Sequence, residues 1–420
     1  MRQALPSVVP LLASVALLIA GSGVLSMLLP IRAEMEAFGT LSIGVMGSAH
    51  SAGFVAGCLL GARLVARVGH IRTFAALVGL ASCLFLAHAL IVHPLAWWVL
   101  RAASGACFAT LFLVIESWLN ARATNATRGA VFCTYAVISH LCGSMGQIAV
   151  SLGEPDRFVL FSVGSILVSL SALPVALARV EAPSPPPAPR VRIGALWHAS
   201  PVGFAGCAAA GFGGGAFWSL GPSFAIDATG SAEAVPLLMT APILAAALVQ
   251  WPVGLLSDRI DRRTVIAAMA AAAAGIALAI HADLAGAGAL TLAFAAFGAA
   301  SIPVNALCVA NANDFAPEGA AVETAAGLLL VWACGAVAGP VVASLLMERL
   351  GPEALFLHAG AVFATLAVFA LWRRGRRDAP EAEGRGGFLD AVVAVETVAP
   401  IEPIQSSQET GHRTLGTQAA

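Results

Sequence analysis

Lysine is missing from this chain: all 22 of its basic residues are arginine. A Walker A loop uses a lysine to hold nucleotide phosphates, so the chain carries no P-loop motor of its own. A Schiff-base cofactor such as retinal also needs a lysine amine, so that class of pump is excluded as well. The sequence also lacks HExxH, GxSxG and histidine-rich runs, and it therefore predicts no membrane enzyme, no catalytic residue and no cofactor.

Charged residues are scarce, at 11% of the chain, whereas soluble domains carry about 25%. Apolar residues make up 59% of the sequence, and its mean hydropathy is +0.87. A chain of this composition cannot cover a water-exposed surface, so its expected surroundings are the lipid bilayer. The formal net charge of −1 provides no basic surface for nucleic acid. The composition predicts a polytopic membrane protein.

Closely paired cysteines are absent too. The cysteines show no CxxC spacing, and each lies within an apolar run. Free cysteine in such surroundings behaves as a small packing residue. The sequence thus predicts neither a metal site nor a disulfide. The residues concerned are Cys58, Cys83, Cys107, Cys133, Cys142, Cys207, Cys308 and Cys334.

Long apolar runs are the main feature that is present. A helix needs about 20 apolar residues to cross roughly 30 Å of hydrocarbon. We predict an all-α polytopic membrane protein with twelve transmembrane helices in two pseudo-symmetric six-helix bundles. The bundles span 1–178 and 201–372, with a Pro-rich cytoplasmic linker at 179–200 and a disordered cytoplasmic tail at 373–420. The predicted spans lie near 8–30, 42–65, 73–93, 95–118, 129–150, 158–178, 203–226, 233–256, 264–283, 286–311, 320–346 and 353–372.

Arginine is distributed unevenly between the predicted loops. Loops on the side of the N-terminus carry most of the arginines, whereas the other side receives only Arg32, Arg157 and Arg349. Cytoplasmic loops are enriched in basic residues, so both termini are predicted to be cytoplasmic. We expect a monomer in a bacterial cytoplasmic (inner) membrane.

The two halves of the sequence repeat each other. Gly105 and Asn120 of the fourth run recur as Gly298 and Asn313 of the tenth, each shifted by 193 residues. A basic loop follows both the second and the eighth run. Many carriers build their site at the interface between such repeats.

The loop after the eighth run resembles the signature G-x-L-[GAS]-D-R-x-G-R-R of the major facilitator superfamily. It departs at Asp261, where the family usually has glycine, and the loop after the second run keeps only Arg67 and Gly69 of the pattern. Other strings resemble the YcaD-like branch of that family, among them Ile115-Glu-Ser-Trp-Leu-Asn120 and Trp251-Pro-Val-Gly254. The resemblance implies a transporter whose central cavity is lined mainly by helices 1, 4, 7 and 10. The signature matches at Gly254, Leu256, Ser257, Asp258, Arg259, Arg262 and Arg263.

The signature charges form a candidate gating motif at one end of the bundle. Asp258 is expected to pair with arginines and to cap the helix that follows, which would latch two helices together. Arg262 and Arg263 are equally compatible with simple anchoring at the cytoplasmic surface. The candidate gating residues are Gly254, Asp258, Arg259, Arg262, Arg263, Arg67 and Gly69.

Four ionisable side chains inside the predicted spans are candidates for proton coupling. An ionisable group at membrane depth is costly, so each is a candidate functional group. Glu116 is either a proton carrier or a structural acid that pairs with Arg122, Arg128 or the end of the fifth helix. His50 and His140 are either proton relays or buried neutral imidazoles. Arg101 either faces the cavity, pairs within the bundle or reaches the interface.

Polar and aromatic side chains on the spans are candidates for solute contact. Phe217 and Trp218 offer rings that could stack on an organic solute, while the glycines around them are better explained by close helix packing. The amides and the single tyrosine offer hydrogen bonds. The candidates are Glu116, Asn120, Tyr135, Phe217, Trp218, Asn305 and Asn311.

The sequence as a whole favours a secondary active transporter. It would move a small organic solute by alternating access, driven by protons because no ATPase machinery is encoded. Two alternatives stay open: a facilitative uniporter, and a membrane receptor or scaffold that does not transport.

Overall fold

The structure is a computed structural model. The structure describes residues 5–124, 127–177, 193–284, 286–317 and 320–376, together with 388, 391–392 and 397. These residues form helices and connecting turns, with no strand among them. The first half contains α1 (Leu5–Met35), α2 (Thr40–Val68), α3 (His70–Leu90), α4 (Pro94–Arg122), α5 (Arg128–Ala149), η1 (Val150–Leu152), α6 (Phe158–Leu170) and α7 (Ala172–Leu177). The second contains α8 (Ile193–Ala199), α9 (Pro201–Thr229), η2 (Ala232–Ala234), α10 (Val235–Arg259), α11 (Arg262–His281), α12 (Gly286–Asp314), α13 (Ala321–Leu350) and α14 (Ala354–Arg374).

Twelve helical stretches match the twelve predicted spans. Within the described residues, eleven are long and apolar enough to cross a membrane. The twelfth, α9, is 29 residues long and therefore long enough to cross a membrane, but its many glycines lower its hydropathy. One span consists of α6 and α7 together, because Pro174 has no N–H to continue the helical hydrogen bonding across Ser171. The predicted twelve-helix fold is confirmed.

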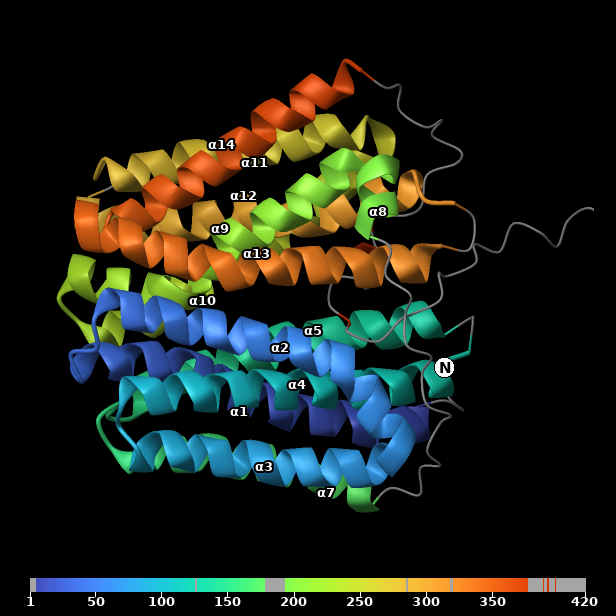
Figure 1. The fold of residues 1–420 in the computed structure, drawn as a ribbon, viewed down its shortest axis with the longest axis vertical. Coiled ribbons are helices and arrows are strands. Elements are labelled where there is room, and N and C mark those ends of the chain that lie inside the picture. The colour runs from blue at the N-terminus through green and yellow to red at the C-terminus, as the bar shows by residue number, and fades with distance from the viewer. Residues whose placement is uncertain are drawn as a thin grey trace, which may run out of the picture.

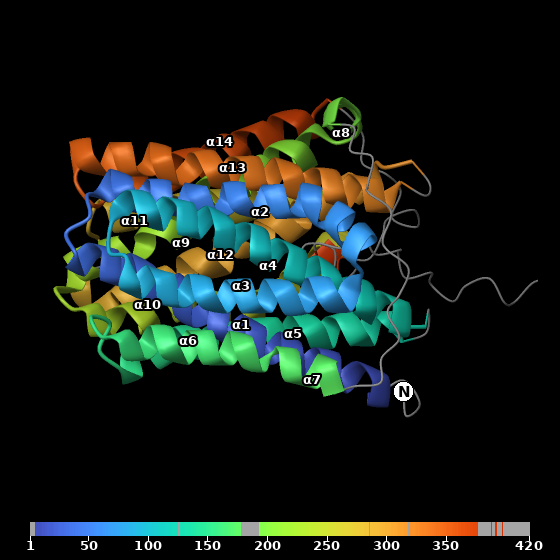
Figure 2. The same ribbon diagram turned by 60° about the horizontal axis from the view of Figure 1, so that its bottom comes forward.

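The helices form two bundles, α1–α7 and α9–α14, which lie one above the other in Figure 1. In the turned view of Figure 2 the first bundle lies in front and partly covers the second. Helix pairing is the same in both. In the first bundle α1 packs on α5, α2 on α4, and α3 on α6; in the second α9 packs on α13, α10 on α12, and α11 on α14. The structure therefore reproduces the sequence duplication as a spatial repeat.

Two equivalent glycines show why the repeat is visible in the sequence. A Cβ on Gly105 of α4 would clash with the backbone of α2, coming within 2.9 Å of the Phe54 nitrogen. A Cβ on Gly298 of α12 would equally clash with α10, 2.6 Å from the carbonyl oxygen of Pro242. Small residues allow membrane helices to approach closely, so each bundle needs a glycine at this position.

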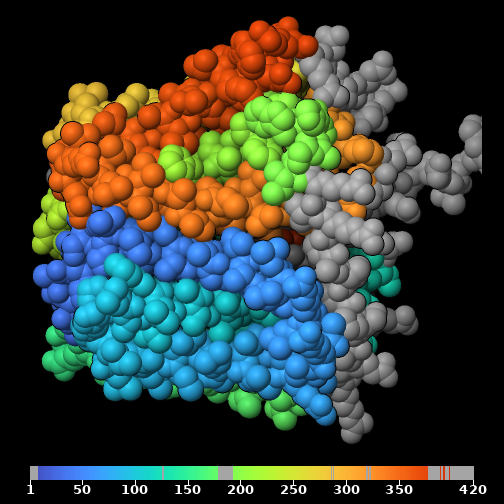
Figure 3. All heavy atoms as spheres, in the orientation of Figure 1, coloured from blue at the N-terminus to red at the C-terminus, as the bar shows by residue number. Residues whose placement is uncertain are grey.

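We call the face where α1 begins and α14 ends the terminal face. The two bundles meet at the opposite face. The backbone N–H of Leu41, early in α2, donates to the Glu348 carboxylate of α13 over 3.1 Å. Nearby, Gly44 of α2 abuts Ser344 and Pro340 of α13. Figure 3 shows the surfaces of α2 and α13 in contact across this boundary. The two halves are thus joined at the opposite face by helices of different repeats.

Two predicted non-membrane regions contain ordered structure. α8 (Ile193–Ala199) falls within the range predicted as linker, whereas the Pro-rich residues 181–190 lie outside the described residues. In the range predicted as a disordered tail, α14 continues to Arg374, and Phe388 and Ala391 are helical and buried. Most of the remaining tail lies outside the described residues.

Candidate solute-binding site

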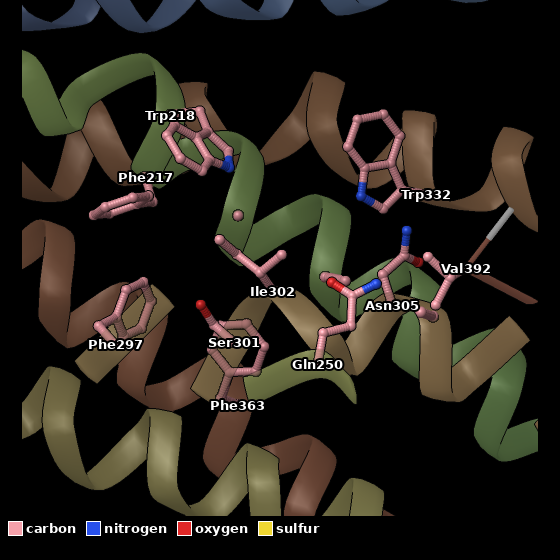
Figure 4. Close-up of a pocket in the computed structure, with 13 residues that line it drawn as sticks. Phe217, Trp218, Gln250, Phe297, Ser301, Ile302, Asn305, Trp332, Phe363 and Val392 are labelled. Atoms are coloured by element: carbon pink, nitrogen blue, oxygen red, sulfur yellow. The ribbon is translucent and has the colours of Figure 1, made fainter. Parts of the chain in front are cut away.

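A cavity of about 150 Å³ lies within the second bundle, between α9, α10, α12 and α13. Trp218 comes from α9, Gln250 from α10, Asn305 from α12 and Trp332 from α13. In Figure 4 the amides of Gln250 and Asn305 lie beside each other, with Trp332 nearby. Ser301 lies one turn before Asn305 and adds a hydroxyl to the same wall. Aromatic faces and neutral hydrogen-bonding groups therefore surround one space.

Close helix packing positions these aromatic walls. A Cβ on Gly211 would clash with the backbone of Trp332, so α9 and α13 approach at the level of the cavity. Phe217 belongs to an aromatic cluster, with its ring centroid 5.1 Å from that of Phe297 and 5.5 Å from that of Phe294. Phe217 is therefore held rigidly by the core, although it also lines the cavity.

Two further spaces adjoin this cavity and share lining residues with it. One of about 290 Å³ is lined by Ser139, His140 and Gln147 of α5 and by Trp218, which also lines the first cavity. The other, which we call the α5/α10 groove, has a volume of about 340 Å³ and is shared by α5 and α10. Side chains from both repeats thus face a set of adjoining spaces.

The described residues that line these three spaces include no Asp, Glu or Arg. Two amide oxygens at the walls, Oδ1 of Asn305 and Oε1 of Gln147, have no hydrogen-bond partner among the described residues. Buried polar atoms normally have partners, so a bound molecule with hydrogen-bond donors would complete these walls. The uncharged lining suits a neutral solute, because a buried charge would need an opposite charge nearby.

Comparison with known proteins agrees with this arrangement. The sequence model of the Major Facilitator Superfamily matches residues 203–407. An uncharacterized MFS-type transporter of Enterobacter sp. (strain 638) is 26% identical over 382 residues, covering 89% of this chain and 97% of the relative. The uncharacterized MFS-type transporter YcaD of Escherichia coli O139:H28 is 25% identical over 376 residues, covering 89% and 97%. The second half of the chain thus matches the Major Facilitator Superfamily model, and most of the chain is similar to MFS-type transporters.

Solved structures show the same facilitator fold. The nucleoside transporter NupG aligns with a TM-score of 0.73 at 15% identity, covering 87% of this chain and 98% of that one. A bacterial homologue of the human lysosomal transporter Spinster, in an inward-facing and occupied conformation, aligns with a TM-score of 0.71 at 14% identity, covering 90% and 97%.

Only some predicted solute contacts reach the described cavities. Phe217, Trp218 and Asn305 line the first cavity. His140, a proton-coupling candidate, lines the second. Asn311 instead donates to Ser200 Oγ over 2.8 Å, and that hydroxyl accepts from the Gly203 N–H as the cap of α9. The lining of these spaces comes from α5, α9, α10, α12, α13 and α14 and from Phe388 and Val392, with no described contribution from α1 or α4.

Glu116 and Tyr135 form a pair within the first bundle. The Tyr135 hydroxyl on α5 donates to Oε1 of Glu116 on α4 over 2.8 Å, and both side chains are buried. Neither residue, nor Asn120 on the same helix, is among the described lining of the three spaces. The structure thus brings two predicted residues together as a link between α4 and α5.

His50 and Arg101 also lie in the first bundle, where α2 meets α4. Arg101 lies close enough to act electrostatically on His50. The Nδ1 atom of His50 and the Nε atom of Arg101 are buried without a hydrogen-bond partner among the described residues. These two proton-coupling candidates are therefore neighbours, separate from His140 at the cavity wall.

The loop between α10 and α11, which carries the signature residues, contains an ion network around a buried arginine. Arg262 at the start of α11 binds Asp258 of α10 over 2.9 Å and Asp314 of α12 over 2.7 Å, with its side chain 1% exposed. It also donates to Ser257 Oγ over 3.3 Å. A buried arginine with two carboxylates joins three helices, which goes beyond surface anchoring.

Asp261, rather than Asp258, caps α11, which corrects the expected role of Asp258. The Asp261 carboxylate accepts from the Arg263 N–H over 3.0 Å and binds the Arg263 side chain over 2.8 Å. Burial alone would raise the pKa of the Asp261 carboxyl, but the Arg263 side-chain and backbone hydrogen bonds outweigh it and lower the pKa. Asp261, at the position where the family pattern has glycine, thus provides the N-cap of α11.

The remaining gating candidates have simpler roles. Arg259 and Arg67 are exposed at the terminal face. Gly69 joins α2 to α3 with a φ of +88°, a conformation that favours glycine. Trp332, Ser301 and Asp314 were missed as functional residues in the sequence. Ser301 lies four residues before Asn305, and that spacing was the available signal.

Proposed function

We propose that this facilitator moves a small, neutral organic solute across the bacterial inner membrane by alternating access. The observation that carries the proposal is the set of adjoining spaces that share lining residues, draw on both repeats and have no Asp, Glu or Arg among their described lining. Trp218 and Trp332 would stack on a planar or apolar body, while Gln250 and Asn305 would bond its polar groups. It would act as a monomer, with the solute and the bilayer as its partners.

The orientation proposed is that the terminal face is cytoplasmic. Arg67, Arg72, Arg259 and Arg374 lie at this face, as the enrichment of basic residues in cytoplasmic loops would require. The two halves touch at the opposite face through Leu41 and Glu348. We therefore assign the structure to the inward-facing half of the cycle, the state named for the similar Spinster homologue.

Proton coupling is proposed as the energy source. His140 lines the second space, and Glu116 is a carboxylate buried within the first bundle. If Glu116 carries the proton, Glu116→Gln should abolish gradient-driven accumulation and leave counterflow exchange intact. Gln keeps an oxygen that can accept from Tyr135, so the packing is preserved. Unchanged accumulation would remove Glu116 from the coupling mechanism.

The transport proposal is tested by flux into proteoliposomes. The panel should contain neutral ring compounds, beginning with radiolabelled uridine and adenosine, because the similar NupG is named a nucleoside transporter. We expect a panel compound to enter, and Asn305→Ala or Trp218→Ala to reduce its entry. Trp372→Ala is the matched control, since Trp372 is 48% exposed near the end of α14. Absence of solute-dependent flux under every imposed gradient would support a receptor or scaffold instead.

A further inference from the structure

Three described residues beyond the last transmembrane helix, Phe388, Ala391 and Val392, pack against the bundle. We call these residues the Phe388 segment. Phe388 is 2% exposed and Ala391 is fully buried, and both belong to the same apolar core as the membrane helices. Phe388, Ala391 and Val392 are helical, and spacings of three and four residues place them on one helix face. This apolar face is therefore in contact with the rest of the protein.

Phe388 packs directly on Gly254, the first glycine of the signature loop. A methyl group on Gly254 would lie 2.7 Å from Cε1 of the Phe388 ring, which is closer than real side-chain contacts allow. Because glycine has no side chain, the aromatic ring can occupy this space. Gly254 thus forms part of the surface that contacts Phe388.

The segment is also bonded to the ion network of the signature loop. The backbone N–H of Phe388 donates to Oδ1 of Asp258 over 3.2 Å. The same oxygen accepts from Arg262, whose guanidinium also binds Asp314. A hydrogen bond to a charged acceptor is stronger than one between neutral groups, so this contact fixes the segment at the end of α10.

The segment lies between helices that belong to different halves. Phe388 and Val392 line the α5/α10 groove together with Val137 of α5 and Trp251 of α10. Val392 also lines the first cavity, alongside Asn305. For the terminal face to close, α5 and α10 must approach each other in the space that this segment occupies.

We propose that the α5/α10 groove is a binding site for the chain's own Phe388 segment, and that its occupation holds the facilitator inward-facing. Release of the segment is then required before the terminal face closes and the opposite face opens. The conformational consequence rests on the alternating-access function proposed above, whereas the binding itself does not depend on any solute.

The test follows opening at the opposite face without any solute. A reporter cysteine is placed by Leu41→Cys in the full-length chain, and its modification by a hydrophilic maleimide is timed in detergent. The chain without the reporter corrects for the natural cysteines. Phe388→Ala should raise the modification rate several-fold, because it removes the ring that packs on Gly254. Phe158→Ala, the same change at a 49% exposed position of α6, should leave the rate unaltered.

Gly254→Ala provides a second variant, from the receiving side of the contact. Its added methyl group would displace the ring, so it should raise the rate in the same way, with folding checked by size-exclusion chromatography. An unchanged or slower rate in Phe388→Ala overturns the proposal. A rise confined to Gly254→Ala also overturns it, because the effect would then belong to the loop itself. Because no solute is present, neither outcome depends on the transport assay.

Discussion

Nε of Arg262 lies 2.7 Å from Oδ2 of Asp314, so the signature arginine of α11 is bound to the last residue of α12. The Arg262 side chain is 1% exposed and that of Asp314 is 3% exposed. Burial of both groups makes the ion pair a structural connection of the second bundle. Removing Arg262 should therefore destabilise the fold, because the buried Asp314 carboxylate then loses this cation.

Arg262→Met should destabilise the protein by about 3–5 kcal/mol, because it removes the cation bound by the buried Asp314 carboxylate. Thermal unfolding in detergent measures the loss. The double variant Arg262→Met/Asp314→Leu should recover part of it, since the uncompensated Asp314 charge is then gone. Arg259→Met is the matched control at an exposed position and should change stability by less than about 0.5 kcal/mol. Equal losses in the single and double variants would contradict this account.

Tyr135→Phe removes the hydroxyl that donates to buried Glu116. A protein hydrogen bond contributes about 0.5–1.5 kcal/mol net, so a loss of this size is expected. Glu116→Gln should lose less, because an acceptor oxygen remains. A double-mutant cycle of Tyr135→Phe with Glu116→Ala, which removes the acceptor, measures the coupling by thermal unfolding; strictly additive losses would show that the bond contributes nothing to stability.

Gly298→Ala should destabilise the second bundle by about 1–3 kcal/mol, because the added methyl group overpacks the contact between α12 and α10. Gly105→Ala should behave alike in the first bundle. Gly275→Ala is the control, since a Cβ there meets no atom within 4 Å among the described residues and α11 is a regular helix. Alanine is the better helix former, so the control should be neutral or slightly stabilising. The reverse order in unfolding temperature would refute the close-approach explanation.

The Asp261 cap predicts a pH dependence of stability. The pKa of the Asp261 carboxyl in the folded protein lies below its ordinary value of 3.8. Such a group stabilises the fold above its unfolded-state pKa, and the contribution disappears as pH falls through the folded-state pKa. The stability difference between wild type and Asp261→Asn should therefore be constant above about pH 5 and shrink below about pH 4. A difference that grows as pH falls would be inconsistent with the lowered pKa.

The sequence by itself determined the number of spans, the duplication and the signature loop. These are local properties: a run of apolar residues crosses a membrane wherever it packs, and the shift of 193 residues between Gly105 and Gly298 is readable in one chain. The close approaches that these two glycines allow are the physical cause of the repeat. Arg262 was identified from the signature loop, which is also a local pattern. Its partner Asp314 lies on another helix and was not identified.

Only the tertiary structure decided which face of each helix meets a cavity. In a membrane helix the lipid-facing and protein-facing sides are both apolar, so the sequence contains little information about rotation around the helix axis. Asn305 and Asn311 look alike in the sequence, yet Asn305 lines the cavity and Asn311 supports the cap of α9. The contact between Phe388 and Gly254 joins residues distant in the chain, and the packing of the folded bundle alone brings them together.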